Sequence, residues 1–165
     1  MQSRLLLGIS VLLASCSVEP PATPMCRVDA AQRESTAGAA ACLIKIDKWL
    51  ITTANRHSEK FDLPGGNAAD SETAQCSAHR NTWEQTGFNV EVGAYLGQTE
   101  TGLRVYDCRL PPAFTAELKS YPVPDWVNAE ISAIRLHNPY ELEHHDWQRG
   151  DELVNVRDWF NQVAN

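Results

Sequence analysis

The segment from Leu63 to Phe88 constrains the fold more than any other part of the chain. It begins with residues 64–66, Pro-Gly-Gly, which cannot continue a β-strand and permit backbone angles that other residues avoid. Ser71 or Thr73 can then cap a helix, and Gly87 suits the left-handed position at which helices commonly end. The sequence therefore predicts a sharp loop that leads into one capped helix.

Strands are predicted on both sides of this helix. Runs rich in β-branched and aliphatic residues cover residues 41–46, 49–54, 88–96, 103–110 and 130–136. The first two runs are separated only by Asp47 and Lys48, which predicts a hairpin. Apolar residues recur at helical steps from Leu153 to Val163, which predicts an amphipathic helix begun by Asp151. This order predicts an α/β fold with helices packed on a mixed sheet.

The size and charge of the chain limit its class. With 165 residues, 43% of them hydrophobic, the chain can bury one sizeable core. Its formal charge is −7 and it has no cluster of Lys and Arg, which argues against binding to a nucleic acid polymer. The negative charge of the chain does not exclude a small anionic ligand, because a metal ion and one or two arginines can make a local site positively charged.

The first sixteen residues resemble an export signal. Arg4 precedes an apolar run, residues 5–13, that is too short to span a bilayer as a stable helix. Residues 13–16, Leu-Ala-Ser-Cys, resemble the lipobox of bacterial lipoproteins. This resemblance implies that residues 1–15 are removed and that Cys16 is lipidated. The alternative is an ordinary secretory signal with an incidental cysteine.

The lipobox resemblance also predicts the organisation and location of the chain. Residues 16–40 are rich in Pro, Ala, Ser and Thr, which predicts a flexible tether between the lipidated cysteine and a domain of residues 41–165. In such lipoproteins, a residue other than Asp directly after the cysteine, here Ser17, usually permits sorting to an outer membrane. We therefore expect a periplasm-facing lipoprotein of the bacterial cell envelope, attached to the membrane by its lipid anchor. The sequence leaves the oligomeric state open.

Four further cysteines predict one or two disulfides. An exported chain meets an oxidising compartment, in which cysteines pair. Three complete pairings are open, and the spacings match no zinc pattern. The residues are Cys26, Cys42, Cys76 and Cys108.

Residues 66–88 resemble the Nudix box, G-x5-E-x7-R-E-U-x-E-E-x-G-U, where U is a bulky apolar residue. Six specified positions match: Gly66, Glu72, Arg80, Glu84, Gly87 and Phe88. Asn81 and Gln85 replace glutamates, and Thr82 replaces an apolar residue. The resemblance implies a Nudix fold, in which a mixed, curved β-sheet is sandwiched between helices.

The Nudix resemblance implies that the chain hydrolyses a nucleoside diphosphate linked to another group, with Mg²⁺ or Mn²⁺. Arg80 and Glu84 would be catalytic, and Gly65 and Gly66 would lie close to the substrate. The metal ligands would be Glu72, Asn81, Glu84 and Gln85.

The helical spacing of residues 81, 84 and 85 gives a physical reason for such a site. Side chains at i, i+3 and i+4 share one face of a helix, so three carboxylates there would converge on a hard cation. Asn81 and Gln85 remove two of these charges, and an amide is a weaker ligand that cannot act as a general base near neutral pH. We therefore expect weak hydrolysis of a diphosphate outside the cytoplasm. The alternative is a catalytically inactive domain that binds a diphosphate ligand or a protein.

The general base is not assigned by the box. The wider family sometimes supplies this base from a loop outside the box, so Glu100 and Glu130 are candidates; the alternative is that both are ordinary solvated carboxylates. Residues 144–146, His-His-Asp, are expected to form a solvated loop. His79 is expected to be a surface or packing residue.

Overall fold

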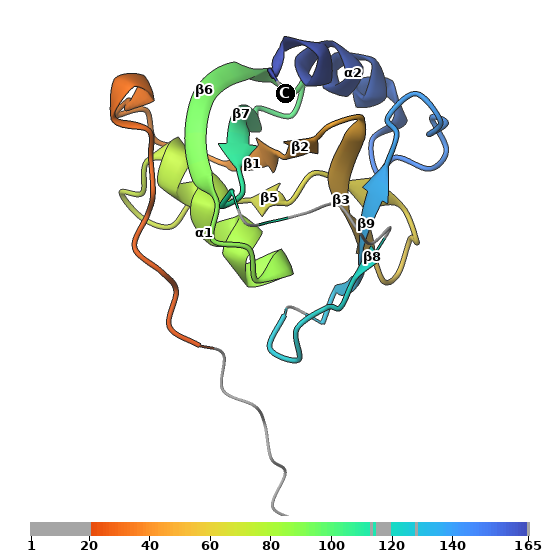
Figure 1. Ribbon diagram of the computed structural model, residues 1–165, viewed down its shortest axis with the longest axis horizontal. Helices are drawn as coiled ribbons and strands as arrows, with labels where there is room; N and C mark the ends of the chain where they lie inside the picture. The colour runs from red at the N-terminus through yellow and green to blue at the C-terminus, as the bar shows by residue number, and fades with distance from the viewer. Residues whose placement is uncertain (1–20, 113, 115–119, 128, 165) are drawn as a thin grey trace, which may run out of the picture.

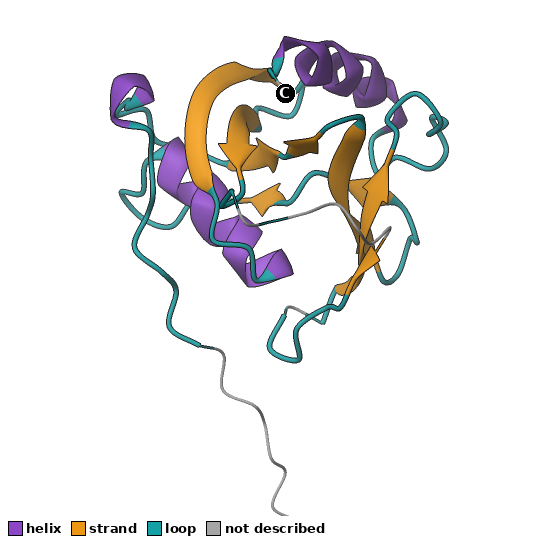
Figure 2. Ribbon diagram, in the orientation of Figure 1, coloured by secondary structure: helices purple, strands orange, loops and turns teal. Residues whose placement is uncertain are grey.

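Two β-sheets and two α-helices make up the folded part of the chain (Figures 1 and 2). The structure is a computed structural model that describes residues 21–112, 114, 120–127 and 129–164. The predicted signal and its Cys16 lie outside these residues. Within them, no helix is long and apolar enough to cross a membrane.

The strands are β1 (Ala40–Leu43), β2 (Lys45–Ile46), β3 (Trp49–Asn55), β4 (Phe61–Asp62), β5 (Gly65–Gly66), β6 (Glu91–Gln98), β7 (Arg104–Arg109), β8 (Ser120–Tyr121) and β9 (Ile131–His137). The helices are α1 (Ala74–Thr86) and α2 (Leu153–Gln162), with short 3₁₀ turns at Ala30–Gln32 and Gly150–Glu152. One sheet has the order β5-β1-β7-β6, and the other has the order β2-β3-β9-β8 with β4 paired to β3. Only β1 and β7 pair in parallel among these described strands, so the predicted mixed α/β architecture is confirmed.

Strand β1 is buried on both faces. Its residues Ala40 and Cys42 belong to the apolar cluster that includes Ala74 and Ala78 of α1. The intervening Ala41 belongs to a second cluster, which includes Leu153, Val156 and Phe160 of α2. Because successive side chains of a strand point to opposite faces, β1 lies between the two helices, as the sandwich prediction requires.

The predicted hairpin forms only in part. Lys45 and Ile46 pair with Trp49 and Leu50 in β2 and β3. The preceding strand β1 instead pairs with β7 in the other sheet. The chain passes from one sheet to the other at Ile44, so a run that looks continuous in sequence is divided between two sheets.

The ends of α1 follow the predicted capping signals. Thr73, one of the two predicted caps, accepts a hydrogen bond from the backbone NH of Cys76 at 3.3 Å. Gly87 ends the helix with φ 73°, in the left-handed region, and its NH donates to the Trp83 carbonyl at 2.8 Å. These caps fix where the box helix begins and ends.

Two disulfides select one of the three complete pairings. Cys42 bonds Cys108 across the neighbouring strands β1 and β7, and Cys26 bonds Cys76 of α1. The second bond ties residues before β1 to the box helix. In the same region Gln75 donates to the Gln32 carbonyl at 2.8 Å. Part of the segment predicted as a tether, residues 16–40, therefore packs against the domain.

Candidate functional site

Arg80 donates hydrogen bonds to both glutamates of the box, Glu72 and Glu84. Its Nε and Nη2 donate to the two carboxylate oxygens of Glu72, each at 2.9 Å, and its Nη1 donates to Glu84 at 2.9 Å. Burial alone would raise the pKa of Glu72, but hydrogen bonds from Arg80 and from the Ala69 NH outweigh it and lower this pKa. Arg80 thus holds Glu72 as an anion and orients the carboxylate of Glu84.

Asn81 points from α1 to the loop that begins the box. Its Nδ2 donates to the carbonyl of Asn67 at 3.1 Å and to the carbonyl and Oγ of Ser77 at 2.9 and 3.2 Å. The residue is only 8% exposed. A Cβ atom on Gly66 would lie 2.7 Å from Oδ1 of Asn81, so a larger residue at position 66 would require the Asn81 side chain to move. Asn81 is therefore packed against the loop that the box helix follows.

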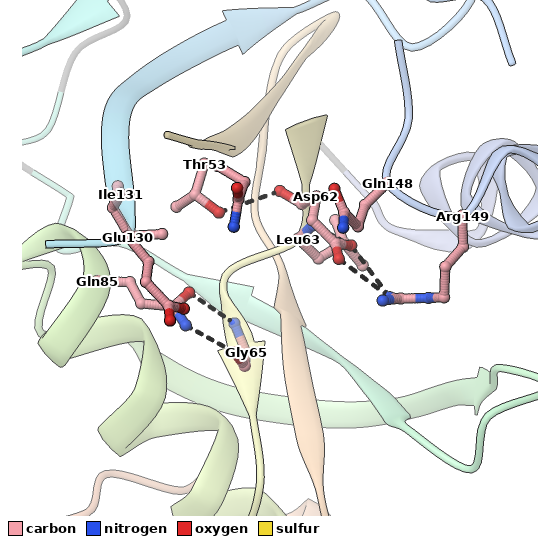
Figure 3. Close-up of a pocket in the computed structure, with 10 residues that line it drawn as sticks. Thr53, Asp62, Leu63, Gly65, Gln85, Glu130, Ile131, Gln148 and Arg149 are labelled. Carbon is pink, nitrogen blue, oxygen red and sulfur yellow. Dashed lines mark hydrogen bonds and ion pairs between the residues drawn. The ribbon is translucent and has the colours of Figure 1, made fainter. Parts of the chain in front are cut away.

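Gln85, one turn further along α1, makes a double contact with Gly65. The Gly65 NH donates to Oε1 of Gln85 at 3.0 Å, and Nε2 of Gln85 donates to the Gly65 carbonyl at 2.7 Å (Figure 3). Gly65 itself is packed tightly, because a Cβ there would lie 2.4 Å from Cβ of Ala41. Both replaced box glutamates are thus amides bonded to the backbone of the same loop.

A polar pocket of about 240 Å³ opens beside this double contact. It brings together side chains from α1, from β3 and β4, from the start of β9 and from the segment before α2 (Figure 3). The residues that line it include Thr53, Asn55, Asp62, Gly65, Gln85, Glu130, Gln148 and Arg149. Glu130 is therefore placed at the box, although 45 residues separate it from Gln85 in the sequence.

Arg56 positions the backbone on both sides of Glu130. The NH of Arg56 donates to the Glu130 carbonyl at 2.6 Å. Its guanidinium donates to the carbonyls of Ala129 and Ile131 at 2.7 and 3.3 Å. Of the two predicted base candidates, Glu130 lines the pocket, while Glu100 lies exposed in the turn between β6 and β7 and is not among the lining residues.

A partly buried charge cluster that the sequence did not indicate lies at the pocket, where Asp62 and Arg149 form part of the lining. Arg149 contacts Asp62 at 3.1 Å and Glu152 at 2.5 Å. Glu152 is 5% exposed, and one of its oxygens has no hydrogen-bond partner among the described residues. Burial raises the pKa of Asp62 to about 6, against the opposing effects of Arg149 and of the Leu63 NH. At the pocket itself, Asp62 and Arg149 form an ion pair, and Glu152 contacts Arg149 from outside the lining.

The remaining histidine predictions agree with the structure. His144 and His145 are exposed, and no group of three metal-binding side chains occurs in the part of the chain that the structure describes. His79 is buried, 1% exposed, and its Nε2 lies 3.0 Å from Oδ1 of Asn89. It is a packing residue.

Glu84 and Glu130 are the carboxylates of the site that could ligate a divalent cation. Mg²⁺ is usually bound through one or two carboxylates together with substrate phosphates. Glu84 has a side chain that is 46% exposed, and Glu130 lines the pocket. Each carboxylate is therefore accessible to a cation that is bound together with a diphosphate.

Comparisons with known proteins give a consistent result. A family model described as NUDIX domain matches residues 29–160. An ADP-ribose pyrophosphatase from Streptococcus suis is similar in structure, with TM-score 0.61 and 13% identity over 79% of this chain and 94% of that one. A UDP-X diphosphatase has TM-score 0.59 and 15% identity over 81% and 67% of the two chains. No curated protein sequence matches the chain.

Proposed function

The chain belongs to the Nudix family, and from this premise we propose that it hydrolyses a small-molecule diphosphate, such as a nucleoside diphosphate linked to another group. One observation carries the proposal: a single polar pocket brings Glu130 to Gln85 of the box and to Gly65, which directly precedes the box. Descriptions of two similar structures, as an ADP-ribose pyrophosphatase and a UDP-X diphosphatase, support a diphosphate substrate.

The described residues suggest a division of roles. Glu84, oriented by Arg80, would hold a Mg²⁺ or Mn²⁺ ion together with the phosphate oxygens of the substrate. When bound, such an ion neutralises the diphosphate and supplies an activated water. Glu130 would accept the proton of the attacking water, since its carboxylate lines the pocket and Arg56 fixes its backbone. Gly65 and Gly66 would let the loop approach the substrate.

Hydrolysis is expected to be slow. In the box, Asn81 and Gln85 carry no charge, and their amides are bonded to the neighbouring backbone. Neutral amides are weaker ligands of a hard cation than carboxylates. A site with Glu84 but without acids at positions 81 and 85 would therefore hold the cation weakly and support turnover well below that of a site with all its carboxylates.

The location forms part of the proposal. Lipidation at Cys16 would anchor the chain, facing the periplasm, at the outer membrane, so its substrate would be a diphosphate outside the cytoplasm. The two disulfides support this assignment, because structural disulfides form in oxidising compartments. Membrane fractionation of the full-length chain and of Cys16→Ser tests it: the variant is expected to leave the membrane fraction, and retention there would contradict lipid anchoring.

A second function is favoured by a specific observation. The amides at positions 81 and 85 contact the loop, as expected if the domain binds a diphosphate or a protein without cleaving it. The discriminating experiment incubates the full-length chain with a panel of nucleotide sugars, dinucleotides and lipid-linked diphosphates, with Mg²⁺, Mn²⁺ or chelator. Metal-dependent formation of monophosphates supports hydrolysis. A ligand that raises the melting temperature without being cleaved supports binding.

A further inference from the structure

Asn81 and Gln85 lie four residues apart on α1, so their side chains share the helix face that meets the loop at residues 65–67. Both side chains bond to backbone groups of this loop. The loop approaches α1 closely at Gly66, where a Cβ would lie 2.7 Å from Oδ1 of Asn81, whereas Gly65 is packed against Ala41 of β1. Contact between helix and loop is therefore close, and these two amides contribute to it together with Ser77 and Arg80, which also donate to loop carbonyls.

The partners of Gln85 require an amide. One partner, the Gly65 NH, is a donor, and the other, the Gly65 carbonyl, is an acceptor. An amide side chain offers one acceptor and one donor group, whereas an ionised carboxylate offers acceptors alone. A glutamate here would place an anionic oxygen against the Gly65 carbonyl. Position 85 thus favours glutamine unless a cation is present between the two oxygens.

Asn81 shows the same preference. All three partners of its Nδ2 are acceptors: the carbonyls of Asn67 and Ser77 and the hydroxyl oxygen of Ser77. The Asn67 carbonyl also accepts from Nη2 of Arg80 at 2.9 Å. Backbone carbonyls and carboxylates are the oxygen ligands that hard cations take in proteins. In this chain, N–H groups instead satisfy the loop carbonyls.

We propose that Asn81 and Gln85 are positioning residues that hold the loop at residues 65–67 against α1 by direct hydrogen bonds, in place of a bridging metal ion. Asn81 and Gln85, which replace two glutamates of the motif, would then fix the shape of the site before any cation or substrate binds. This inference concerns the ligand-free protein and does not depend on whether the pocket hydrolyses a substrate.

The test is the melting temperature of the ligand-free, full-length chain in chelator and in millimolar Mg²⁺ or Mn²⁺. The unsubstituted chain is expected to melt at the same temperature in both. Gln85→Glu and Asn81→Asp, which conserve shape, are each expected to lower the melting temperature in chelator by roughly 2–6 °C. Metal should reverse most of that loss, because the new carboxylate and the loop carbonyl can then share a cation.

Two controls isolate the amide effect. Gln85→Met removes both hydrogen bonds without adding charge, so it should lower the melting temperature equally with and without metal. Gln162→Glu changes an exposed glutamine near the end of α2 and should show no metal response.

Two results would overturn the proposal. One is clear stabilisation of the unsubstituted, ligand-free chain by Mg²⁺ or Mn²⁺. The other is a Gln85→Glu or Asn81→Asp variant that is as stable in chelator as the unsubstituted chain. The first needs no variant, so the proposal stays testable even if a substitution prevents folding. Absence of hydrolysis would contradict the proposed function alone.

Discussion

The side chain of Gln85 and the backbone of Gly65 form a pair of hydrogen bonds, 3.0 and 2.7 Å long, between the box helix and the loop before it. Each bond is expected to contribute about 0.5–1.5 kcal/mol. Gln85→Ala should therefore lower the free energy of unfolding by about 1–3 kcal/mol, measured by urea denaturation in chelator. Gln162→Ala, at an exposed position of α2, is the matched control; an equal effect of both variants would show that the contact contributes no stability.

Restoring both box carboxylates should increase activity. The double variant Asn81→Glu with Gln85→Glu returns two acidic groups to the face that already holds Glu84. If the site has lost only these carboxylates, metal-dependent turnover should rise by about 10²-fold or more. The measurement is the initial rate of monophosphate formation in Mg²⁺, compared with the rate in chelator. A correctly folded double variant that remains inert on every diphosphate would indicate that the pocket serves another purpose.

The disulfide between Cys26 and Cys76 should stabilise the domain by holding the N-terminal segment on α1. It closes a loop with a sequence separation of 50 residues. Replacing both cysteines by serine is expected to lower the free energy of unfolding by about 2–5 kcal/mol. Peptide mapping without reductant should recover the Cys26–Cys76 and Cys42–Cys108 links; a different linkage would contradict the observed pairing.

Asp62 should make stability depend on pH in an unusual direction. Burial raises its pKa from 3.8 to about 6 in the folded chain, where Arg149 and Glu152 are its charged neighbours. Because the folded state binds this proton more tightly, the resulting stability is complete below about pH 3.8 and is lost as pH rises through about 6. Asp62→Asn cannot ionise, so it should lose less stability than the unsubstituted chain between pH 4.5 and roughly 7.

Urea denaturation across that pH range provides the measurement for Asp62. Asp70→Asn, which changes an exposed aspartate before the box helix, is the matched control. Parallel pH profiles for the unsubstituted chain and Asp62→Asn would contradict the effect of burial on this carboxyl group.

Local signals explain which parts of the fold were predictable. The caps at Thr73 and Gly87 and the apolar period of α2 act within a few residues, and the structure confirms them. The division of residues 40–46 between two sheets was missed. It depends on pairing of β1 with β7, more than 60 residues away, and no pattern within the run itself indicates where the chain changes sheet.

At the site, too, contacts within a short segment were predictable and contacts between distant segments were not. Arg80, Glu72 and Glu84 lie within one motif, so their network could be anticipated from spacing. Asp62 and Arg149 are 87 residues apart and meet only through the tertiary fold. Asp62 directly precedes the Leu-Pro-Gly-Gly segment, which is the one sequence signal that could have drawn attention to it.

The most direct test of the proposed active site compares Glu130→Gln with Glu100→Gln. Both variants remove one carboxylate, but only Glu130 lines the pocket beside Gln85 and Gly65. Rates of monophosphate formation from the best diphosphate substrate, in Mg²⁺, should fall by about 10²-fold or more for Glu130→Gln and stay unchanged for Glu100→Gln. Undiminished turnover by Glu130→Gln, or an equal loss in both variants, would contradict this placement of the active site.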